Sequence, residues 1–225
     1  MSGGRVKNRG VKFPKQRLRD SYAFVVDGND EKWYLDMLKR HEKSVKVEVK
    51  PELSGGRTIR EQYELVRELA SSYTKVFWVI DLDVVIKQDR EWRAQSGEER
   101  PSDTLRRAIS TIDKWREDEK VTNIFTVVNT PGLEFWFLLH LEQTSRYYET
   151  CKEVIDRLKD LTGSPLQDYN KSERYYKKAN DDIYTKLKPY LATARANAAK
   201  LGGFDTANLQ SGLSEMYVIF DELEL

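Results

Sequence analysis

The sequence predicts an α/β fold, with a mostly parallel four-stranded sheet, helices on both faces and a helical C-terminal part. Four short apolar runs rich in β-branched and aromatic residues alternate with segments of helical periodicity, which is typical of parallel sheets. From about residue 143 onward the pattern becomes helical. The 225 residues, of which 39% are hydrophobic and 33% charged, are enough for one such domain with a helical addition.

The predicted strands are short apolar runs that end at turn residues or acids. In chain order they cover residues 21–26, 45–49, 76–80 and 124–128. The first stops at Asp27-Gly28-Asn29, and the third, which is the most apolar, stops at Asp81. The second alternates apolar and charged residues, which indicates a strand nearer an edge of the sheet. Right-handed crossovers would then place all the carboxyl ends along one edge.

The predicted helices have apolar residues spaced so that they form one buried face. They cover residues 29–41, 58–72, a segment that begins at 102 or 103, 133–141, 144–161, 179–200 and 211–223. Asn29 or Asp30 is the expected cap of the first helix. Residues 86–102 are polar and contain Gly97 and Pro101, which predicts a loop.

These patterns divide the chain into a basic N-terminal arm (1–20), an α/β domain (21–142) and a helical C-terminal part (143–225) packed on it. The arm is basic through Arg5, Lys7, Arg9, Lys12, Lys15, Arg17 and Arg19. It is either a phosphate-contacting segment or a solvated terminus. The whole chain has 38 basic and 37 acidic residues, so its net charge indicates no class of partner.

Composition excludes several classes of protein. The single cysteine, Cys151, excludes an internal disulfide and a cysteine-based zinc site, and we expect it in the core. Gly55-Gly56 is not followed by the Gly-Lys-Ser or Gly-Lys-Thr of a phosphate-binding loop, so an intrinsic ATPase is not expected. No apolar run approaches the roughly 20 residues that span a bilayer, and no signal peptide is visible. We therefore expect a cytoplasmic protein without a membrane partner.

Acidic residues follow both of the clearest strands. Asp27 ends the first strand and Glu31 lies one helical turn later, while Asp81 and Asp83 follow the third strand. Because parallel strands end at a common edge, these four carboxylates are expected to meet and to repel one another unless a cation lies among them. Oxygen ligands of this kind select Mg²⁺ or Mn²⁺. The alternative is that the acids are helix caps and turn residues.

The segment after the fourth strand contains three further candidates. Glu134 lies deep in apolar sequence, so it either reaches the metal edge or forms a structural pair with an arginine or lysine. His140 is either a general acid or base or a core histidine. Asn129, at the strand end, either binds a phosphate or shapes the turn before Pro131.

A later segment combines aromatic and basic residues suited to base stacking and phosphate contact: Tyr169, Lys171, Arg174, Lys177 and Lys178. The alternative is a solvated, charged loop. We retain the first four of these residues as candidates for nucleic-acid binding.

Several of these segments resemble known families. FVVDGNDEKWYLDML and VFWVIDLDV resemble the Toprim pattern, in which an acid-glycine turn follows the first strand and Asp-x-Asp follows a later one. NTPGLEFWFLLHLEQTSRYYE is similar to the asparagine-rich turn, Phe-Glu-x-Trp and Leu-Leu-His stretch of RloB-like proteins. DYNKSERYYKK resembles the Tyr-x-Lys segment of that family. Together the resemblance covers residues 21 to about 178, and its third segment is the most specific.

The resemblance implies a Toprim-like fold and a nuclease from prokaryotic restriction-linked, phage-defence loci. It implies that Asp27, Asp81 and Asp83 bind Mg²⁺ or Mn²⁺, with Glu31 as helper or base. We therefore expect an endonuclease that cleaves RNA, tRNA included, or DNA. The oligomeric state and the number of metal ions stay open.

The chain departs from the family pattern at two positions, and the first departure favours an alternative. Relatives usually have glutamate where this chain has the shorter Asp27, and Leu133 replaces the usual phenylalanine before Glu134. The shorter Asp27 side chain favours a non-catalytic, Toprim-shaped binding or regulatory subunit. Such a subunit would act through a partner protein, such as an ATPase encoded beside it.

Overall fold

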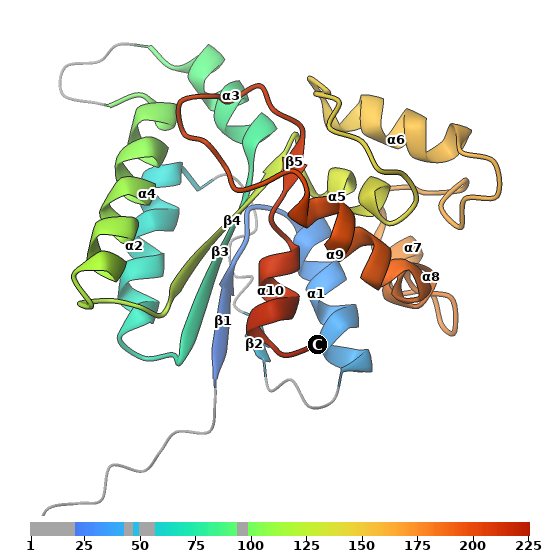
Figure 1. The fold of residues 1–225 in the computed structure, drawn as a ribbon, viewed down its shortest axis with the longest axis horizontal. Coiled ribbons are helices and arrows are strands. Elements are labelled where there is room, and N and C mark those ends of the chain that lie inside the picture. Colours follow the sequence, from blue (N-terminus) through green and yellow to red (C-terminus); the bar gives the residue numbers. More distant parts are fainter. Residues whose placement is uncertain (1–20, 43–46, 50–56, 94–98) are drawn as a thin grey trace, which may run out of the picture.

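The computed structural model describes residues 21–42, 47–49, 57–93 and 99–225 (Figure 1). The predicted basic arm, residues 1–20, lies outside the described residues, as do residues 45 and 46 of the predicted second strand. Within the described residues, no helix combines the length and the apolar character needed to cross a membrane.

The centre of the molecule is a five-stranded sheet in the order β2-β1-β3-β4-β5. The strands are β1 (Tyr22–Val25), β2 (Val47–Val49), β3 (Lys75–Asp81), β4 (Ile124–Thr130) and β5 (Leu213–Ser214). The first four pair in parallel, with β2 at one edge as its alternating pattern indicates. The short β5 pairs antiparallel with β4, so the C-terminal part predicted to be helical also contributes an edge strand.

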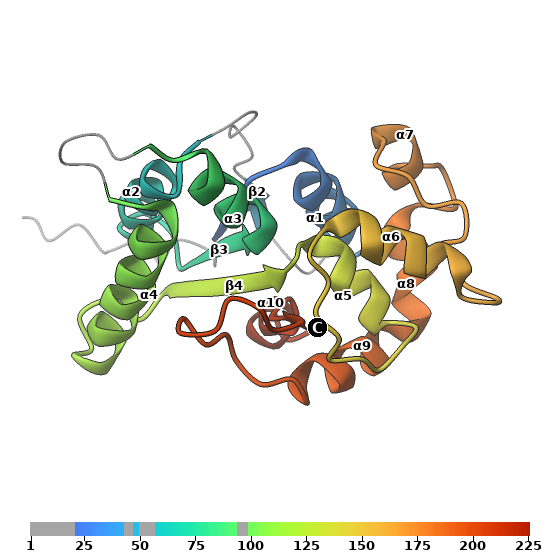
Figure 2. The ribbon, with the colours of Figure 1, turned by 90° about the horizontal axis from the view of Figure 1, so that it is seen from above.

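Helices cover both faces of the sheet, as predicted (Figure 1). One face is covered by α2 (Ile59–Ala70), α3 (Leu82–Glu91) and α4 (Pro101–Glu117). The other face is covered by α1 (Asn29–His41), α5 (Leu133–Leu139), α9 (Leu191–Ala199) and α10 (Tyr217–Glu222). Figure 2 shows α3 and α10 on opposite sides of β4.

The side chains of the strands alternate between two hydrophobic cores, one for each face. Phe77 and Val79 belong to the core under α1 and α5, whereas Val76, Trp78 and Ile80 belong to the core under α2 and α4. The remaining C-terminal elements extend the α5 side of the molecule. They are α6 (Cys151–Asp160), α7 (Glu173–Tyr176), α8 (Ile183–Leu187) and the 3₁₀ turn η1 (Lys188–Tyr190).

Four predicted elements differ from the structure. The predicted 211–223 helix is replaced by β5 and the shorter α10. Helix α3 occupies part of the predicted 86–102 loop, because Leu82 and Val85, one turn apart, are buried in the α2-side core. The predicted 144–161 helix begins only at Cys151, where the Thr150 hydroxyl caps the chain. The predicted 179–200 helix is divided into α8, η1 and α9, with Pro189 in η1, because proline lacks the backbone donor that a continuous helix needs.

The strand order creates a switch point between β1 and β3. From β1 the chain passes through α1 to β2 on one side, and it then crosses back through α2 to β3 on the other side of β1. The two connections lie on opposite faces of the sheet, which makes the carboxyl ends of β1 and β3 its switch point. Ligands of open α/β sheets bind at such points. The fold therefore favours a site where β1 and β3 end.

Candidate functional site

The four predicted carboxylates lie at this switch point, and we call them the acidic cluster (Asp27, Glu31, Asp81 and Asp83). Asp27 follows β1, and Glu31 lies in the first turn of α1. Asp81 is the last residue of β3, and Asp83 lies in the first turn of α3. Glu31 is buried, whereas the three aspartates keep some exposed surface. The cluster is therefore open to solvent through its aspartates.

Glu31 connects the start of α1 to Asp81. Its Oε2 accepts a hydrogen bond from the Gly28 amide at 2.9 Å, which makes Gly28, rather than Asn29 or Asp30, the cap residue of α1. The Glu31 side chain also lies within hydrogen-bonding contact of the Asp81 side chain. Burial and the charge of Asp30 raise the pKa of Glu31 to about 7. Glu31 is thus poised to change protonation near neutral pH.

Asp81 is oriented by the segment that follows β4. Its Oδ1 accepts from the Asn129 amide at 3.2 Å, and its Oδ2 accepts from the Leu133 backbone N–H at 3.2 Å. A side chain at Gly132 would place its Cβ 2.6 Å from Asp81 Oδ2, so this close approach requires glycine. Burial, followed by the charges of Glu31 and Glu134, raises the pKa of Asp81 well above its ordinary value. Asp81 therefore ionises less readily than a free aspartate does.

Asp83 and Asp27 flank this centre. The Asp83 backbone N–H donates to the Pro131 carbonyl at 2.9 Å, and its Oδ2 accepts from the Cys151 thiol at 3.1 Å. Asp27 Oδ1 accepts from the Gln62 amide at 2.8 Å. Burial raises the pKa of both aspartates, and the charge of Asp83 further raises the pKa of Asp27. All four members of the acidic cluster therefore bind protons more tightly than free carboxylates do.

A fifth carboxylate, Glu134, lies beside the cluster with no exposed surface. Its Oε1 accepts from the Tyr169 hydroxyl at 2.9 Å and forms an ion pair with Lys171 Nζ at 2.7 Å. The structural pair with a lysine is thus the alternative that the structure supports. Glu134 Oε2 has no hydrogen-bond partner among the described residues. Lys171 also reaches Asp30 at 3.1 Å, so its ammonium bridges α5 and α1.

The family model for RloB-like proteins matches residues 22–223, nearly the whole chain. The chain belongs to the RloB-like family. No curated protein and no solved structure matches it. The acidic cluster and the Glu134–Lys171 pair both lie within the matched residues, so they belong to the family domain.

The donor atoms of the RloB-like site suit a hard divalent cation, because all of them are carboxylate oxygens and one, Glu134 Oε2, is buried without a partner. Across residues 21–42, 47–49, 57–93 and 99–225, however, no three His, Cys, Asp or Glu side chains are gathered so that they could hold a metal ion as they stand. The chemistry of the site fits Mg²⁺ or Mn²⁺, and binding would require the carboxylates to turn toward one another.

His140 lies in the core of the RloB-like domain. It follows α5, about 9 Å along the helix axis from Glu134, and only 1% of its surface is exposed. Its Nδ1 donates to the Trp136 carbonyl at 2.9 Å, whereas Nε2 has no partner among the described residues. Burial lowers the pKa of His140 to about 4. The structure thus places the ring in the core, which is the second of the two alternatives that the sequence left open.

Two predicted nucleic-acid contacts are also corrected by burial. The Tyr169 ring has no exposed surface, and its hydroxyl pairs with Glu134 and, at 2.6 Å, with the Tyr176 hydroxyl. The ring cannot stack on a base from this position. Asn129 is fully buried between Asp81 and Ser214, whose hydroxyl donates to Asn129 Oδ1 at 2.6 Å. Asn129 therefore orients Asp81 rather than contacting a phosphate directly.

The other basic candidates stay accessible. Lys171 is 42% exposed despite its two ion pairs, and Arg174 is exposed. Lys177 pairs with Asp36 at 3.0 Å and with Glu173 at 3.1 Å. Their roles in nucleic-acid binding stay predictions.

Residues that sequence patterns did not single out complete the site. Gln62 contacts Asp27, Ser214 contacts Asn129, and Tyr176 contacts Tyr169. The three pairs are separated in sequence by 35, 85 and 7 residues, in the order given. The first two separations are longer than any local sequence motif. Only the tyrosine pair lies within one segment of the chain, where it forms part of the family-like DYNKSERYYKK stretch.

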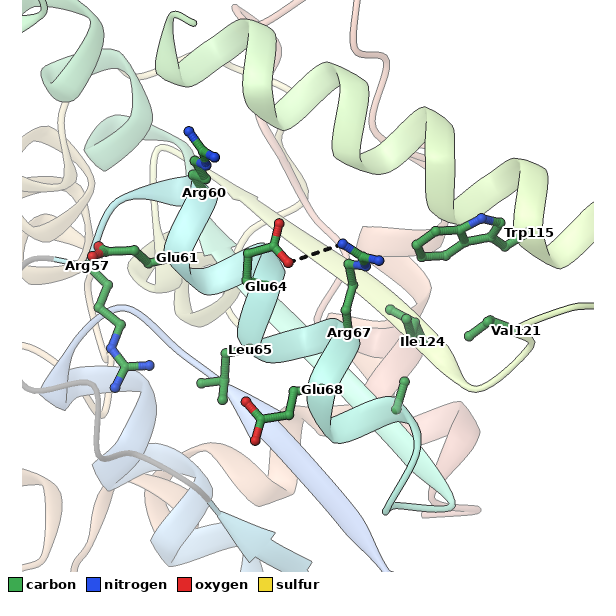
Figure 3. A pocket seen from close by; sticks show the side chains of 11 residues that line it. Arg57, Arg60, Glu61, Glu64, Leu65, Arg67, Glu68, Trp115, Val121 and Ile124 are labelled. Carbon is green, nitrogen blue, oxygen red and sulfur yellow. Dashed lines mark hydrogen bonds and ion pairs between the residues drawn. The ribbon is translucent and has the colours of Figure 1, made fainter. Parts of the chain in front are cut away.

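A separate groove of about 1020 Å³ runs beside α2 and reaches the end of α4 and the start of β4 (Figure 3). It is lined by alternating charges and a few apolar side chains: Arg57, Arg60, Glu61, Glu64, Leu65, Arg67, Glu68, Ala70, Trp115, Val121 and Ile124. Glu64 and Arg67, which lie one turn apart on α2, form an ion pair at 3.1 Å in its lining. No member of the acidic cluster lines this groove, and its balanced charges match no single class of ligand.

Proposed function

We propose that this RloB-like chain is a Mg²⁺- or Mn²⁺-dependent endonuclease with a Toprim-like centre. Its substrate is RNA, tRNA included, or DNA, and its role is prokaryotic anti-phage defence. The observation that carries the proposal is the gathering of the acidic cluster at the β1–β3 switch point, where burial and like charges raise every carboxylate pKa. Acids with perturbed pKa values at a switch point of an α/β sheet are typical of functional sites.

A divalent cation would offset the electrostatic repulsion between the carboxylates of the acidic cluster. The charges of Glu31, Asp83 and Glu134 all raise the pKa of Asp81, so a cation beside Asp81 would displace protons and stabilise the ionised forms. Asp27, Asp81 and Asp83 would hold the ion, since none of these three residues is fully buried. When bound, the ion supplies positive charge that offsets the charge developing on a phosphodiester group.

The residues of the chain would position the reacting groups and move a proton. Glu31, with a pKa of about 7, suits the role of base toward an attacking water. The Asn129 amide and the Leu133 N–H keep Asp81 oriented. Lys171 and Arg174 offer accessible cations on the segment beside α1 to attract a phosphate backbone.

The test is cleavage of supercoiled DNA, single-stranded DNA and total tRNA with Mg²⁺ or Mn²⁺, with and without chelator. Asp81→Ala should reduce cleavage at least about 100-fold, because loss of a ligand exceeds the roughly 10- to 100-fold effects of outer-shell partners. Asp118→Ala is the matched control, since Asp118 is an exposed acid paired with Lys120 at 2.8 Å at the end of α4. It should leave cleavage unchanged.

The outcomes separate the nuclease from its alternative. Metal-dependent cleavage that is lost in Asp81→Ala supports the nuclease and identifies its substrate class. Absence of cleavage together with absence of metal binding by calorimetry would overturn it. That result would leave a non-catalytic binding or regulatory subunit that acts through a partner protein.

A further inference from the structure

Gln62 is a fully buried amide that connects the hydrophobic core to the acidic cluster. It lies on α2 and is 1% exposed. Its Nε2 donates to Asp27 Oδ1 at 2.8 Å, and its Oε1 accepts from Trp78 Nε1 at 2.9 Å. A longer contact joins Nε2 to the Arg57 carbonyl at 3.4 Å. Both ends of the amide are therefore in use.

The direction of this amide is fixed by Trp78. An indole N–H can only donate, so it must face the amide oxygen, and the amide NH₂ must then face Asp27. Trp78 is itself immobilised in the middle of β3, where it is fully buried and stacks on Tyr63 with ring centroids 6.0 Å apart. An amide held in this way cannot flip to present its oxygen to Asp27.

The consequence for Asp27 is a defined orientation. Asp27 lies beyond the end of β1, in the turn that leads to α1, where the backbone alone gives its side chain little support. The Gln62 donor ties one carboxylate oxygen, Oδ1, to the α2 side of the sheet. A donor on Oδ1 also favours the ionised carboxylate against the burial and the Asp83 charge that oppose it.

We propose that Gln62 is a positioning residue that holds the Asp27 carboxylate in place for a divalent cation, with Trp78 setting the direction of its amide. The inference rests on the proposed function, because it assigns Asp27 to the metal site. It adds a residue from α2 to a site otherwise built by the ends of β1, β3 and β4.

The test compares Mn²⁺ affinity, measured by calorimetry on the full chain, in the wild type and in Gln62→Met. Methionine has nearly the volume of glutamine, but it cannot donate to Asp27 and its sulfur is only a weak acceptor for Trp78. We expect Mn²⁺ affinity to fall about 10-fold or more, as for loss of other outer-shell partners of metal ligands. Asn197→Leu is the matched control, because it removes a different buried amide. The Asn197 amide donates to the Leu139 carbonyl at 2.9 Å and contacts no member of the acidic cluster through this bond. The substitution should lower thermal stability without changing Mn²⁺ affinity.

A double-mutant cycle shows whether Gln62 acts through Asp27. In an Asp27→Ala background, Gln62→Met should cause no further loss of Mn²⁺ affinity, whereas a general structural effect would add to the first loss. If Gln62→Met does not fold, Gln62→Asn replaces it, because asparagine is one methylene too short to reach both Trp78 and Asp27.

The failures are distinguishable. A wild type that binds Mn²⁺ while Gln62→Met binds it equally well overturns the positioning role and leaves the proposed function standing. Equal additional losses in the wild-type and Asp27→Ala backgrounds overturn it as well. A wild type that binds no Mn²⁺ overturns both.

Discussion

A buried titratable side chain lies at each end of α5, and the two differ in whether a charged partner reaches them. At the N-terminal end, Glu134 has no exposed surface but is paired with the Lys171 ammonium and the Tyr169 hydroxyl. At the C-terminal end, His140 is equally buried, and no cation or acid is paired with it; one of its nitrogens has no partner among the described residues. The first end faces the acidic cluster, and the second faces the aromatic core around Trp136.

This difference shows that a buried titratable group favours its charged form only where it has a partner of opposite charge. A buried carboxylate is tolerated where a cation and a hydroxyl reach it, because pairing offsets much of the cost of removing it from water. The histidine has no such compensation, so its charged form is disfavoured and its pKa falls to about 4. The stability of the Glu134 end of the helix therefore depends on the Lys171 partner. The stability of the His140 end depends on the imidazole staying neutral.

The largest expected effect is the acid sensitivity of the His140 end. The folded pKa lies below the ordinary value of 6.5, so the stabilising contribution is complete above pH 6.5 and is lost as the pH falls toward 4. The loss in free energy of unfolding should total about 3 kcal/mol, at about 1.4 kcal/mol per pH unit. Urea unfolding of the wild type and of His140→Leu at about pH 7.5 and about pH 4 measures it. Equal losses in both proteins between the two pH values would show that His140 is not the group responsible.

The next effect concerns the partner at the other end. Lys171→Met leaves Glu134 buried with only the Tyr169 hydroxyl, and breaking a buried pair costs about 3–5 kcal/mol. Because the Lys171 side chain is 42% exposed, water offsets part of this cost, and we expect a loss of about 2 kcal/mol in free energy of unfolding.

Lys177→Met is the control for this variant, measured by the same urea unfolding at neutral pH. Lys177 lies nearby in the chain and pairs with Asp36 and Glu173, both of which keep exposed side-chain surface. Its loss should cost less than about 1 kcal/mol. The comparison would fail if the two variants were equally destabilised, since the burial of Glu134 would then have no special consequence.

The smallest effect comes from the hydroxyl pair. Tyr169→Phe removes the donor to Glu134 Oε1 and should cost about 1 kcal/mol, as for a typical buried hydrogen bond. Tyr176→Phe removes only the contact between the two hydroxyls and should cost less. Thermal unfolding of both variants measures the difference. The reverse order would indicate that Tyr176, rather than Tyr169, supports the carboxylate.

The sequence was sufficient to predict the parts of the site that depend on local patterns. Apolar runs that stop at Asp27 and Asp81 predicted two parallel strands ending in acids, and the structure has β1 and β3 there. The resemblance over residues 21 to about 178 also predicted the family, whose model matches residues 22–223. These features depend on strand composition and on short motifs, which a single sequence carries.

The parts that could not be predicted depend on contacts between distant residues. The charged residues around Tyr169 in the sequence indicated an accessible side chain. In the structure the Tyr169 ring is buried, and its hydroxyl donates to Glu134, which lies 35 residues earlier in the chain. Strand β5 has two residues, which is too short for any periodicity to reveal. Helix α3 was missed because it begins directly after β3, where its first apolar residues resemble a continuation of the strand.

The contact between Ser214 and Asn129 has a consequence for the order in which the site can form during synthesis. Asn129 orients Asp81, and its own amide oxygen is held by a hydroxyl that is translated 85 residues later. A ribosome-bound chain that has completed β1, β3 and β4 therefore contains every carboxylate of the cluster before Asp81 has its full set of supports. A hydrolytic activity that depends on Asp81 would be delayed until β5 has been made and has joined the edge of the sheet.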